Sequence, residues 1–220
     1  MPLAGQGMLM TSMDVDPEHE AEFNEWYDRE HLAERVAIPG FLEARRYVAV
    51  EAAPKYLGLY STATFEALSS PAYRAALANQ TAWSKTNISR FRNMGRAVAR
   101  ITASRGQGRG AALGLVRLRP EAGSHDALRG RIEAKLAPSG LAGIVSMHLL
   151  ESDPRLSTSL TEPDAPNPGA SDWYVLVDGS EVESVSGVIG SRFGEVLASD
   201  AEVVTTGIYR LLWDLTKPDL

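Results

Sequence analysis

The sequence predicts an α+β fold in which two tandem βαββαβ repeats form a barrel, with their antiparallel sheets packed face to face. Two observations indicate it: the order of strand and helix signals occurs twice along the 220 residues, and a segment rich in glycine and arginine, 105–110, separates the two occurrences. Right-handed strand–helix–strand crossovers place both helices of a repeat on one face of its sheet. The other face stays open, and two such faces would bury each other. We therefore expect an N-terminal repeat over residues 1–106 and a C-terminal repeat over residues 107–220.

The clearest helix of the first repeat spans Glu18 to Val36. Residues 8–15 precede it as a strand, and Asp16-Pro17-Glu18 supplies an N-cap, a proline in the first turn and an acidic charge. Bulky side chains then recur every three or four residues, at Phe23, Trp26, Tyr27, Leu32 and Val36. Ile38-Pro39-Gly40 ends this helix.

A hairpin, a second helix and a strand are predicted for the remainder of the first repeat. Residues 41–51 and 56–65 are the expected strands of the hairpin, joined by a turn at 53–55. Either Ser69 or Ser70, followed by Pro71, begins a helix that runs to about Asn79. An irregular aromatic stretch follows, and residues 96–104 form the closing strand.

The second repeat shows the same order of signals. Strands are expected at 112–119, 144–151, 173–178 and 203–215, and helices at 124–136 and 185–198. Residues 153–172 insert a loop rich in Pro, Ser, Thr, Gly and Asp that the first repeat lacks. Loops of this length are usually either functional lids or disordered segments, and both alternatives stay open.

Composition excludes several classes of function. The formal charge of -6 is spread along the chain without a block of like charges, so we expect no nucleic-acid partner. The absence of cysteine excludes disulfides, thiolate nucleophiles and cysteine-ligated metals, and it suits a reducing cytosol. No run of 18 apolar residues and no secretory leader occur, so we expect a cytoplasmic protein that does not enter a membrane.

Three stretches of the first repeat carry a family resemblance. Residues 23–32 (Phe-Asn-Glu-Trp-Tyr-Asp-Arg-Glu-His-Leu), Ile38-Pro39-Gly40-Phe41 and Tyr56-Leu57-Gly58-Leu59-Tyr60 resemble the EthD-like branch of the dimeric α/β-barrel superfamily, here in a tandem-repeat form. The resemblance covers most of residues 8–104 and implies a ferredoxin-like barrel. Relatives include isomerases, polyketide cyclases, dehydratases, monooxygenases and haem enzymes, and many have no known activity. The second repeat lacks the Trp-Tyr-x-x-x-His helix, which implies at most one pocket per chain.

The first helix carries the candidate catalytic group. Tyr27, His31 and Arg35 stand four residues apart on one stripe, and Trp26 lies on the adjacent stripe. If this stripe faces a pocket, His31 would move a proton near neutral pH, and Arg35 or Arg45 would hold a substrate carboxylate or enolate. The hypothesis is acid–base catalysis on a small molecule without a cofactor, with His31 as the catalytic residue.

Further candidates for substrate binding lie on strands. Tyr47 and Tyr60 belong to the predicted hairpin, and His148 belongs to strand 144–151, where it would face the same pocket or sit among satisfied polar groups of the core. The competing interpretation is structural: His31 would be capped by a carboxylate at a helix end, and Trp26 would fill the seam between helix and sheet.

Three functions follow from these alternatives. The first is a cofactor-independent isomerase, cyclase or lyase, the second a non-catalytic ligand-binding or interaction protein, and the third a haem- or oxygen-dependent enzyme with His31 or His148 as axial ligand. No metal-ligand motif is present, so we expect neither a metal nor another cofactor. If the candidate tyrosines and His31 converge on an open cavity, the enzyme hypothesis is favoured. If these side chains are buried in a filled core, the binding-protein hypothesis is favoured. A homodimer formed through strand edges stays open.

Overall fold

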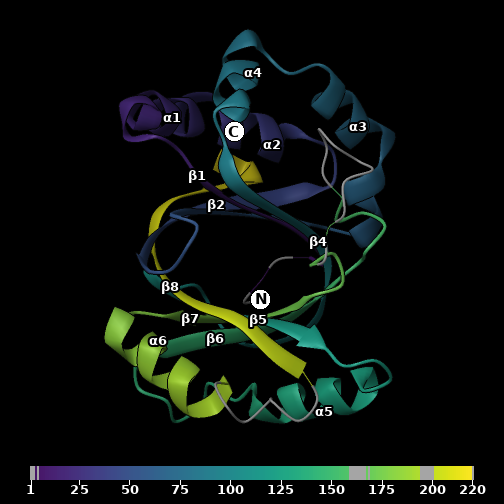
Figure 1. Cartoon of the computed structure of the whole chain (residues 1–220), viewed down its shortest axis with the longest axis vertical. Coiled ribbons are helices and arrows are strands. Elements are labelled where there is room, and N and C mark those ends of the chain that lie inside the picture. The colour runs from purple at the N-terminus through teal and green to yellow at the C-terminus, as the bar shows by residue number, and fades with distance from the viewer. Residues whose placement is uncertain (1–2, 4, 159–166, 168, 194–200, 220) are drawn as a thin grey trace.

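The computed structural model describes residues 3, 5–158, 167, 169–193 and 201–219 (Figure 1). Its first half contains β1 (Gly7–Asp14), α1 (Glu20–Trp26), α2 (Leu32–Ala37), β2 (Phe41–Glu51), β3 (Tyr56–Thr62), α3 (Pro71–Ala78), α4 (Ala82–Ser89) and β4 (Arg92–Gly106). Its second half contains β5 (Ala112–Pro120), α5 (His125–Lys135), β6 (Ile144–Ser152), β7 (Trp173–Gly179), α6 (Val182–Val188) and β8 (Ala201–Thr216).

All eight strands form one closed antiparallel barrel in the order β1-β3-β2-β8-β5-β7-β6-β4. Each half contributes four neighbouring strands, β4-β1-β3-β2 and β8-β5-β7-β6, and the halves are joined by the pairs β2–β8 and β4–β6. The predicted α+β barrel is confirmed. Joining the half-sheets at both edges leaves no open sheet edge, which removes the hydrogen-bonding groups that would otherwise recruit another strand.

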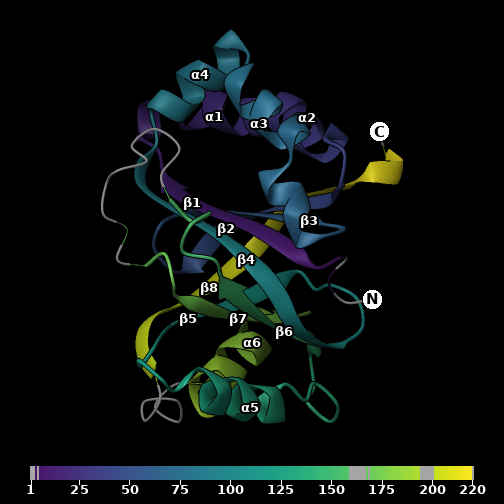
Figure 2. The same cartoon turned by 90° about the vertical axis from the view of Figure 1, so that its right-hand side faces the viewer.

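Helices cover the outside of the barrel in two layers. Helices α1 to α4 lie over the strands of the first half, and α5 and α6 lie over those of the second half (Figures 1 and 2). Because side chains alternate along a strand, each half-sheet has one face toward its helices and one toward the barrel interior. On β1, Leu9 and Met13 pack toward the helices, whereas Met8 and Met10 pack inside the barrel.

The structure differs from the sequence prediction in three places. The predicted helix 18–36 is divided into α1 and α2 by a π-helical turn, Tyr27–His31. Helix α4 falls in the stretch expected to be irregular, where the Thr81 side chain accepts a hydrogen bond from Ser84 N at 2.9 Å and caps the helix. Strand β4 is longer than predicted at both ends and takes up the first residues of the expected linker.

Two predicted segments of the second half fall partly outside the described residues. The helix expected at 185–198 appears as α6 and a following π-helical turn, Ile189–Phe193, and its last residues lie outside the described ranges. The same holds for much of the loop 153–172. In the described part of the chain, no helix combines the length and the apolar character needed to cross a bilayer.

Candidate functional site

Aromatic side chains of the first helix meet between that helix and the sheet. In the π-helical turn, Leu32 N–H donates to the carbonyl oxygen of Tyr27, one residue further back than in an α-helix. The wider turn lets Trp26, Tyr27 and His31 all be buried against the sheet. The His31 ring lies 4.3 Å from the Trp26 ring and 4.9 Å from the Tyr27 ring, measured between centroids.

Strands β1 and β3 add hydroxyl groups to this cluster. The Tyr60 hydroxyl donates to the Tyr27 hydroxyl at 3.1 Å. A Cβ at Gly58 would lie 2.9 Å from Thr11 Oγ1 and 3.3 Å from the Tyr27 hydroxyl, so this glycine leaves the space in which the hydroxyls gather. Thr11 Oγ1 is buried and has no hydrogen-bond partner among the described residues.

Two buried arginines face the cluster, and only one forms an ion pair among the described residues. Arg46 donates to Asp28 at 2.8 Å and to Asn24, and its guanidinium lies 4.6 Å from the centroid of the Tyr27 ring. Arg35 is 4% exposed, and its Nη1 is buried without a hydrogen-bond partner in the described part of the chain. Glu34 is near enough for the charge of Arg35 to act on its pKa, but the two side chains do not form an ion pair.

The surroundings favour the neutral forms of His31 and Tyr60. Burial, followed by the charges of Arg35 and Arg46, lowers the pKa of His31 well below 6.5. Burial, with the hydrogen bond to Tyr27 adding to it, raises the pKa of Tyr60 well above 10. At neutral pH the cluster therefore offers a neutral His31 imidazole, a neutral Tyr60 phenol and the Arg35 guanidinium. The Asp28 carboxylate accepts from Arg46, and His31 Nδ1 has no partner among the described residues.

Helix α4 fixes the outer side of the cluster. The Trp26 indole N–H donates to Ser84 Oγ at 3.1 Å, and Glu30 accepts from Thr81 Oγ1 at 2.6 Å. Both bonds join the first helix to α4, which therefore holds the indole against His31. Periodicity alone does not reveal this contribution because α4 has no strong apolar stripe.

The structure brings together five of the predicted site residues, Trp26, Tyr27, His31, Arg35 and Tyr60, and places Tyr47 and His148 on the other face of the sheet. His148 lies inside the barrel, where Nδ1 is 2.7 Å from Ser104 Oγ and Nε2 is 3.0 Å from Ser146 Oγ. Burial lowers the pKa of His148, although Asp178, 3.4 Å from Nε2, acts in the opposite direction.

Tyr47 lies near the same interior polar network. Its hydroxyl is buried, and burial raises its pKa. Arg45 contacts Glu43 at 2.8 Å and Asp178 at 3.6 Å in this network. The alternative that Arg45 shares a site with His31 is therefore wrong, because the sheet lies between them.

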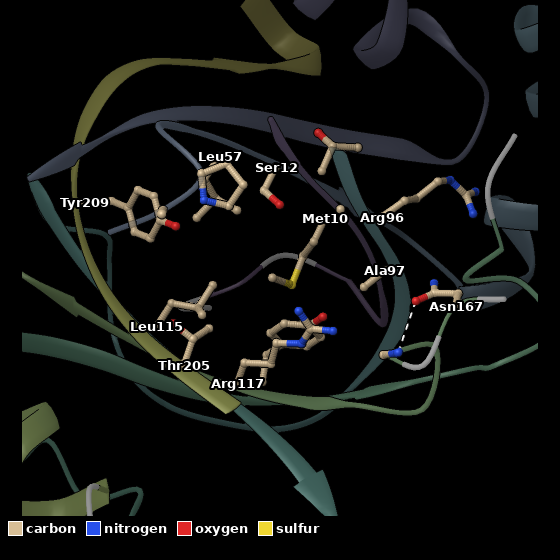
Figure 3. A pocket seen from close by; sticks show the side chains of 16 residues that line it. Met10, Ser12, Leu57, Arg96, Ala97, Leu115, Arg117, Asn167, Thr205 and Tyr209 are labelled. Carbon is tan, nitrogen blue, oxygen red and sulfur yellow. Dashed lines mark hydrogen bonds between the residues drawn. The ribbon is translucent and has the colours of Figure 1, made fainter. Parts of the chain in front are cut away.

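A cavity of about 90 Å³ lies inside the barrel, at the end where the turn between β2 and β3 lies (Figure 3). Its walls include the apolar side chains of Met10, Leu57, Ala97 and Leu115 and the polar side chains of Ser12, Arg117, Tyr174, Thr205 and Tyr209. Sequence reasoning did not select any of these residues as part of a site. Alternation along the strands would have separated inward from outward side chains, but not shown which of them border empty space.

No three His, Asp or Glu side chains gather into a metal-binding group in the ranges that the structure describes. Trp26, Tyr27, His31, Arg35 and Tyr60, called the helix-side cluster below, present aromatic, hydroxyl and guanidinium groups. Such a set suits recognition of an organic anion, because guanidinium and hydroxyl groups donate hydrogen bonds to carboxylate oxygens.

Fold comparison defines the class: a chain-length antiparallel α+β barrel shared with solved structures of distant sequence. No protein-family model matches the chain, and no curated protein matches it. A proposed monooxygenase from Fusobacterium nucleatum subsp. nucleatum has a TM-score of 0.63 at 10% identity, over 97% of this chain and 95% of that one.

Two further solved structures share the barrel. An anthrone oxidase-like protein has a TM-score of 0.65 at 9% identity, over 98% of this chain and 94% of that one. A haem-binding protein from Thermus thermophilus has a TM-score of 0.54 at 13% identity, over 96% and 92% of the two chains. At these identities the likeness shows the fold.

Proposed function

We propose that this protein binds a small organic anion between the α1–α2 helix and the sheet, and that it acts on it as a cofactor-independent isomerase or lyase. The observation that carries the proposal is Arg35, a guanidinium that is 4% exposed, whose Nη1 has no hydrogen-bond partner and which forms no ion pair among the described residues. A buried charge without a partner costs several kcal/mol, so such groups are usually paired. A bound carboxylate or enolate would supply the missing partner.

The neighbouring groups suit an anion with a polar, planar body. The Tyr60 hydroxyl donates to Tyr27, which leaves the Tyr27 O–H as a donor toward the anion, and Thr11 Oγ1 adds a hydroxyl without a partner in the described ranges. The Trp26 and Tyr27 rings offer apolar surface beside His31. Together they would orient a small oxygenated molecule against the imidazole.

His31 is the proposed proton carrier. In the free protein its pKa is low, but a bound anion next to it would raise that pKa and offset the effect of Arg35. The neutral imidazole would accept a proton from carbon adjacent to a carbonyl: the C–H bond breaks, an N–H bond forms, and Arg35 stabilises the enolate oxygen. Return of the proton to another carbon gives isomerisation, and loss of a β-substituent gives elimination.

A non-catalytic binding protein is the second candidate function. The observation that favours it is close packing: Trp26 is fully buried, Tyr27 and Tyr60 are almost so, and their rings contact His31. This arrangement matches the filled core that favours a binding protein over an enzyme. In that case Arg35 would still hold the anion, and His31 would act only as a hydrogen-bonding group.

Haem fits neither histidine. Both ring nitrogens of His148 lie within hydrogen-bond distance of serine hydroxyls, and its side chain is fully buried. The rings of Trp26 and Tyr27 occupy the space beside the His31 imidazole, where a porphyrin plane would have to lie. We therefore derive no step through haem.

Deuterium exchange tests the proposed chemistry and binding separately. The protein would be incubated in D₂O with a panel of 2-oxo and 3-oxo carboxylic acids. Deuterium incorporation at the carbon next to the ketone carbonyl would be followed by NMR, and binding would be measured by calorimetry. We expect Arg35→Met to lose binding, and His31→Asn to bind but to lose exchange. His19→Gln, outside the cluster, is the matched control and should behave as the wild type.

Each remaining outcome is decisive. Binding without exchange in the wild type would assign the non-catalytic function. Equal binding of all acids by the wild type and Arg35→Met would reject the helix-side site altogether.

The wider assignment follows the same residues. We propose that residues 1–106 and 107–220 are two repeats of one ancestral unit, and that the first belongs with the EthD-like branch. Support comes from the equal strand order β4-β1-β3-β2 and β8-β5-β7-β6 in the two halves, and from the site residues being confined to the first.

A further inference from the structure

We infer that the cavity inside the barrel is a second ligand site, separate from the helix-side cluster, and that it takes a short-chain carboxylate. The two sites lie on opposite faces of the first half-sheet: Tyr60 points toward the helices, and its neighbours Leu57 and Leu59 point into the barrel. This inference does not depend on the proposed function of His31.

Size limits the ligand. The cavity holds about 90 Å³, whereas an apolar protein cavity of about 150 Å³ accepts benzene. A molecule of about four to six non-hydrogen atoms therefore fits. Met10, Leu57, Ala97 and Leu115 line its inner walls and provide contacts for a short hydrocarbon chain (Figure 3).

Two tyrosine hydroxyls carry the argument for a polar head group. The side chains of Tyr174 and Tyr209 are 8% and 3% exposed, and both line the cavity. In the described part of the chain no hydrogen bond involves either hydroxyl, and neither oxygen is among the fully buried ones, so each is accessible to a ligand in the cavity. Burial raises the pKa of Tyr174, and it raises that of Tyr209 to about 12, so both remain protonated donors across the physiological range.

The rest of the lining is rich in donors. Arg117 lies at the wall, and its Nε donates to Asp172 Oδ2 at 2.6 Å. Arg119 donates to Asp172 at 3.1 Å and to Glu202 at 3.1 Å, so these two guanidinium groups are matched by two carboxylates. None of the described residues that line the cavity is Asp or Glu. The tyrosine hydroxyls and the Arg117 guanidinium are hydrogen-bond donors at the wall, and donors of this kind suit a carboxylate head group.

Access exists at the barrel end. The lining includes Ala53 and Pro54 of the β2–β3 turn and Thr205 near the start of β8, of which Ala53 and Thr205 are exposed. Asn167 also lines this end, where its side-chain oxygen accepts from Gly169 N at 3.1 Å. A Cβ at Gly169 would lie 1.7 Å from Arg117 Nη2, so the glycine lets this turn approach the end of the arginine side chain closely.

Methyl NMR on the full chain tests the site with butyrate as the probe and butyramide as its neutral counterpart. The protein would carry ¹³C-methyl methionine, with the Met10 signal assigned from Met10→Leu. We expect butyrate to shift the Met10 signal and saturate in the millimolar range, as is typical of a ligand with about six non-hydrogen atoms. Butyramide should shift it much less, and Tyr174→Phe/Tyr209→Phe should weaken butyrate binding at least about tenfold.

Arg35→Met separates the two sites. Because Arg35 lies on the helix side of the sheet, this variant should keep the butyrate response of Met10 unchanged even if the proposed function fails. Three outcomes would each overturn the inference. The first is no shift of the Met10 signal up to about 100 mM butyrate, a concentration at which even a weak ligand of this size would register. The others are an equal response to butyramide and loss of the butyrate response in Arg35→Met.

Discussion

Replacing Arg35 with methionine should make the free protein more stable and less able to bind. Methionine keeps most of the buried side-chain length but removes a charge that is 4% exposed and forms no ion pair among the described residues. Replacing buried ionic groups with apolar groups of similar volume commonly stabilises proteins by about 1–4 kcal/mol. For a chain of this length, that corresponds to a rise in Tm of about 2–16 °C.

Thermal unfolding and urea denaturation of the wild type and Arg35→Met would measure the difference. Arg46→Met is the matched control, because Arg46 is equally buried but donates to Asp28 and Asn24 and lies over three aromatic rings. Removing it should lower the free energy of unfolding by about 1–3 kcal/mol. Equal destabilisation by both substitutions would show that Arg35 has a structural partner, and the argument for an anion site would fail.

Two further predictions concern the same cluster. The free energy of unfolding should fall as pH drops below 6.5, because His31 takes up a proton in the unfolded chain but resists protonation in the fold. His31→Gln should reduce the dependence of the free energy of unfolding on pH by up to about 1.4 kcal/mol per pH unit. Urea denaturation between pH 5 and 7.5 would measure this change. Gly58→Ala should destabilise the fold by about 1–3 kcal/mol, because its Cβ would lie 2.9 Å from Thr11 Oγ1. Gly130→Ala, with open space around it on α5, should instead stabilise by about 0.5–1 kcal/mol in the same thermal unfolding assay, and equal effects would contradict the packing argument.

The repeated order of elements was readable from the sequence because each element carries its own local signal. Prolines and capping residues mark the helix starts: the Ser70 side chain, for example, accepts a hydrogen bond from Tyr73 N at 3.1 Å. The spacing of apolar residues marks the buried faces. Helix α4 was missed because Trp83 and Ile88 do not repeat at helical spacing with a clear apolar stripe. Its cap at Thr81 was the available signal.

Local sequence signals did not show which residues of different elements lie on the same face of the sheet. Four-residue spacing correctly grouped Tyr27, His31 and Arg35, although a π-helical turn rather than a regular α-helix buries them together. The same spacing says nothing about Tyr47 or His148, because a strand residue changes face with every position. Only the register of β2, which pairs Tyr47 with Leu57 and Arg46 with Gly58, separates the interior tyrosine from the helix-side arginine.

Whether each buried arginine forms an ion pair discriminates between the candidate functions better than the presence of a histidine does. A neutral His31 among aromatic rings is compatible with catalysis, ligand binding or simple packing, since an uncharged imidazole is tolerated in all three. A buried guanidinium that forms no ion pair and has a buried Nη1 without a hydrogen-bond partner among the described residues is not tolerated equally, because packing alone gives no reason to retain its desolvation cost. Arg46, a few ångströms from the same rings, shows how this fold neutralises an arginine when the role is structural. The contrast between Arg35 and Arg46 therefore makes an anionic ligand the simplest physical reason for the composition of the site.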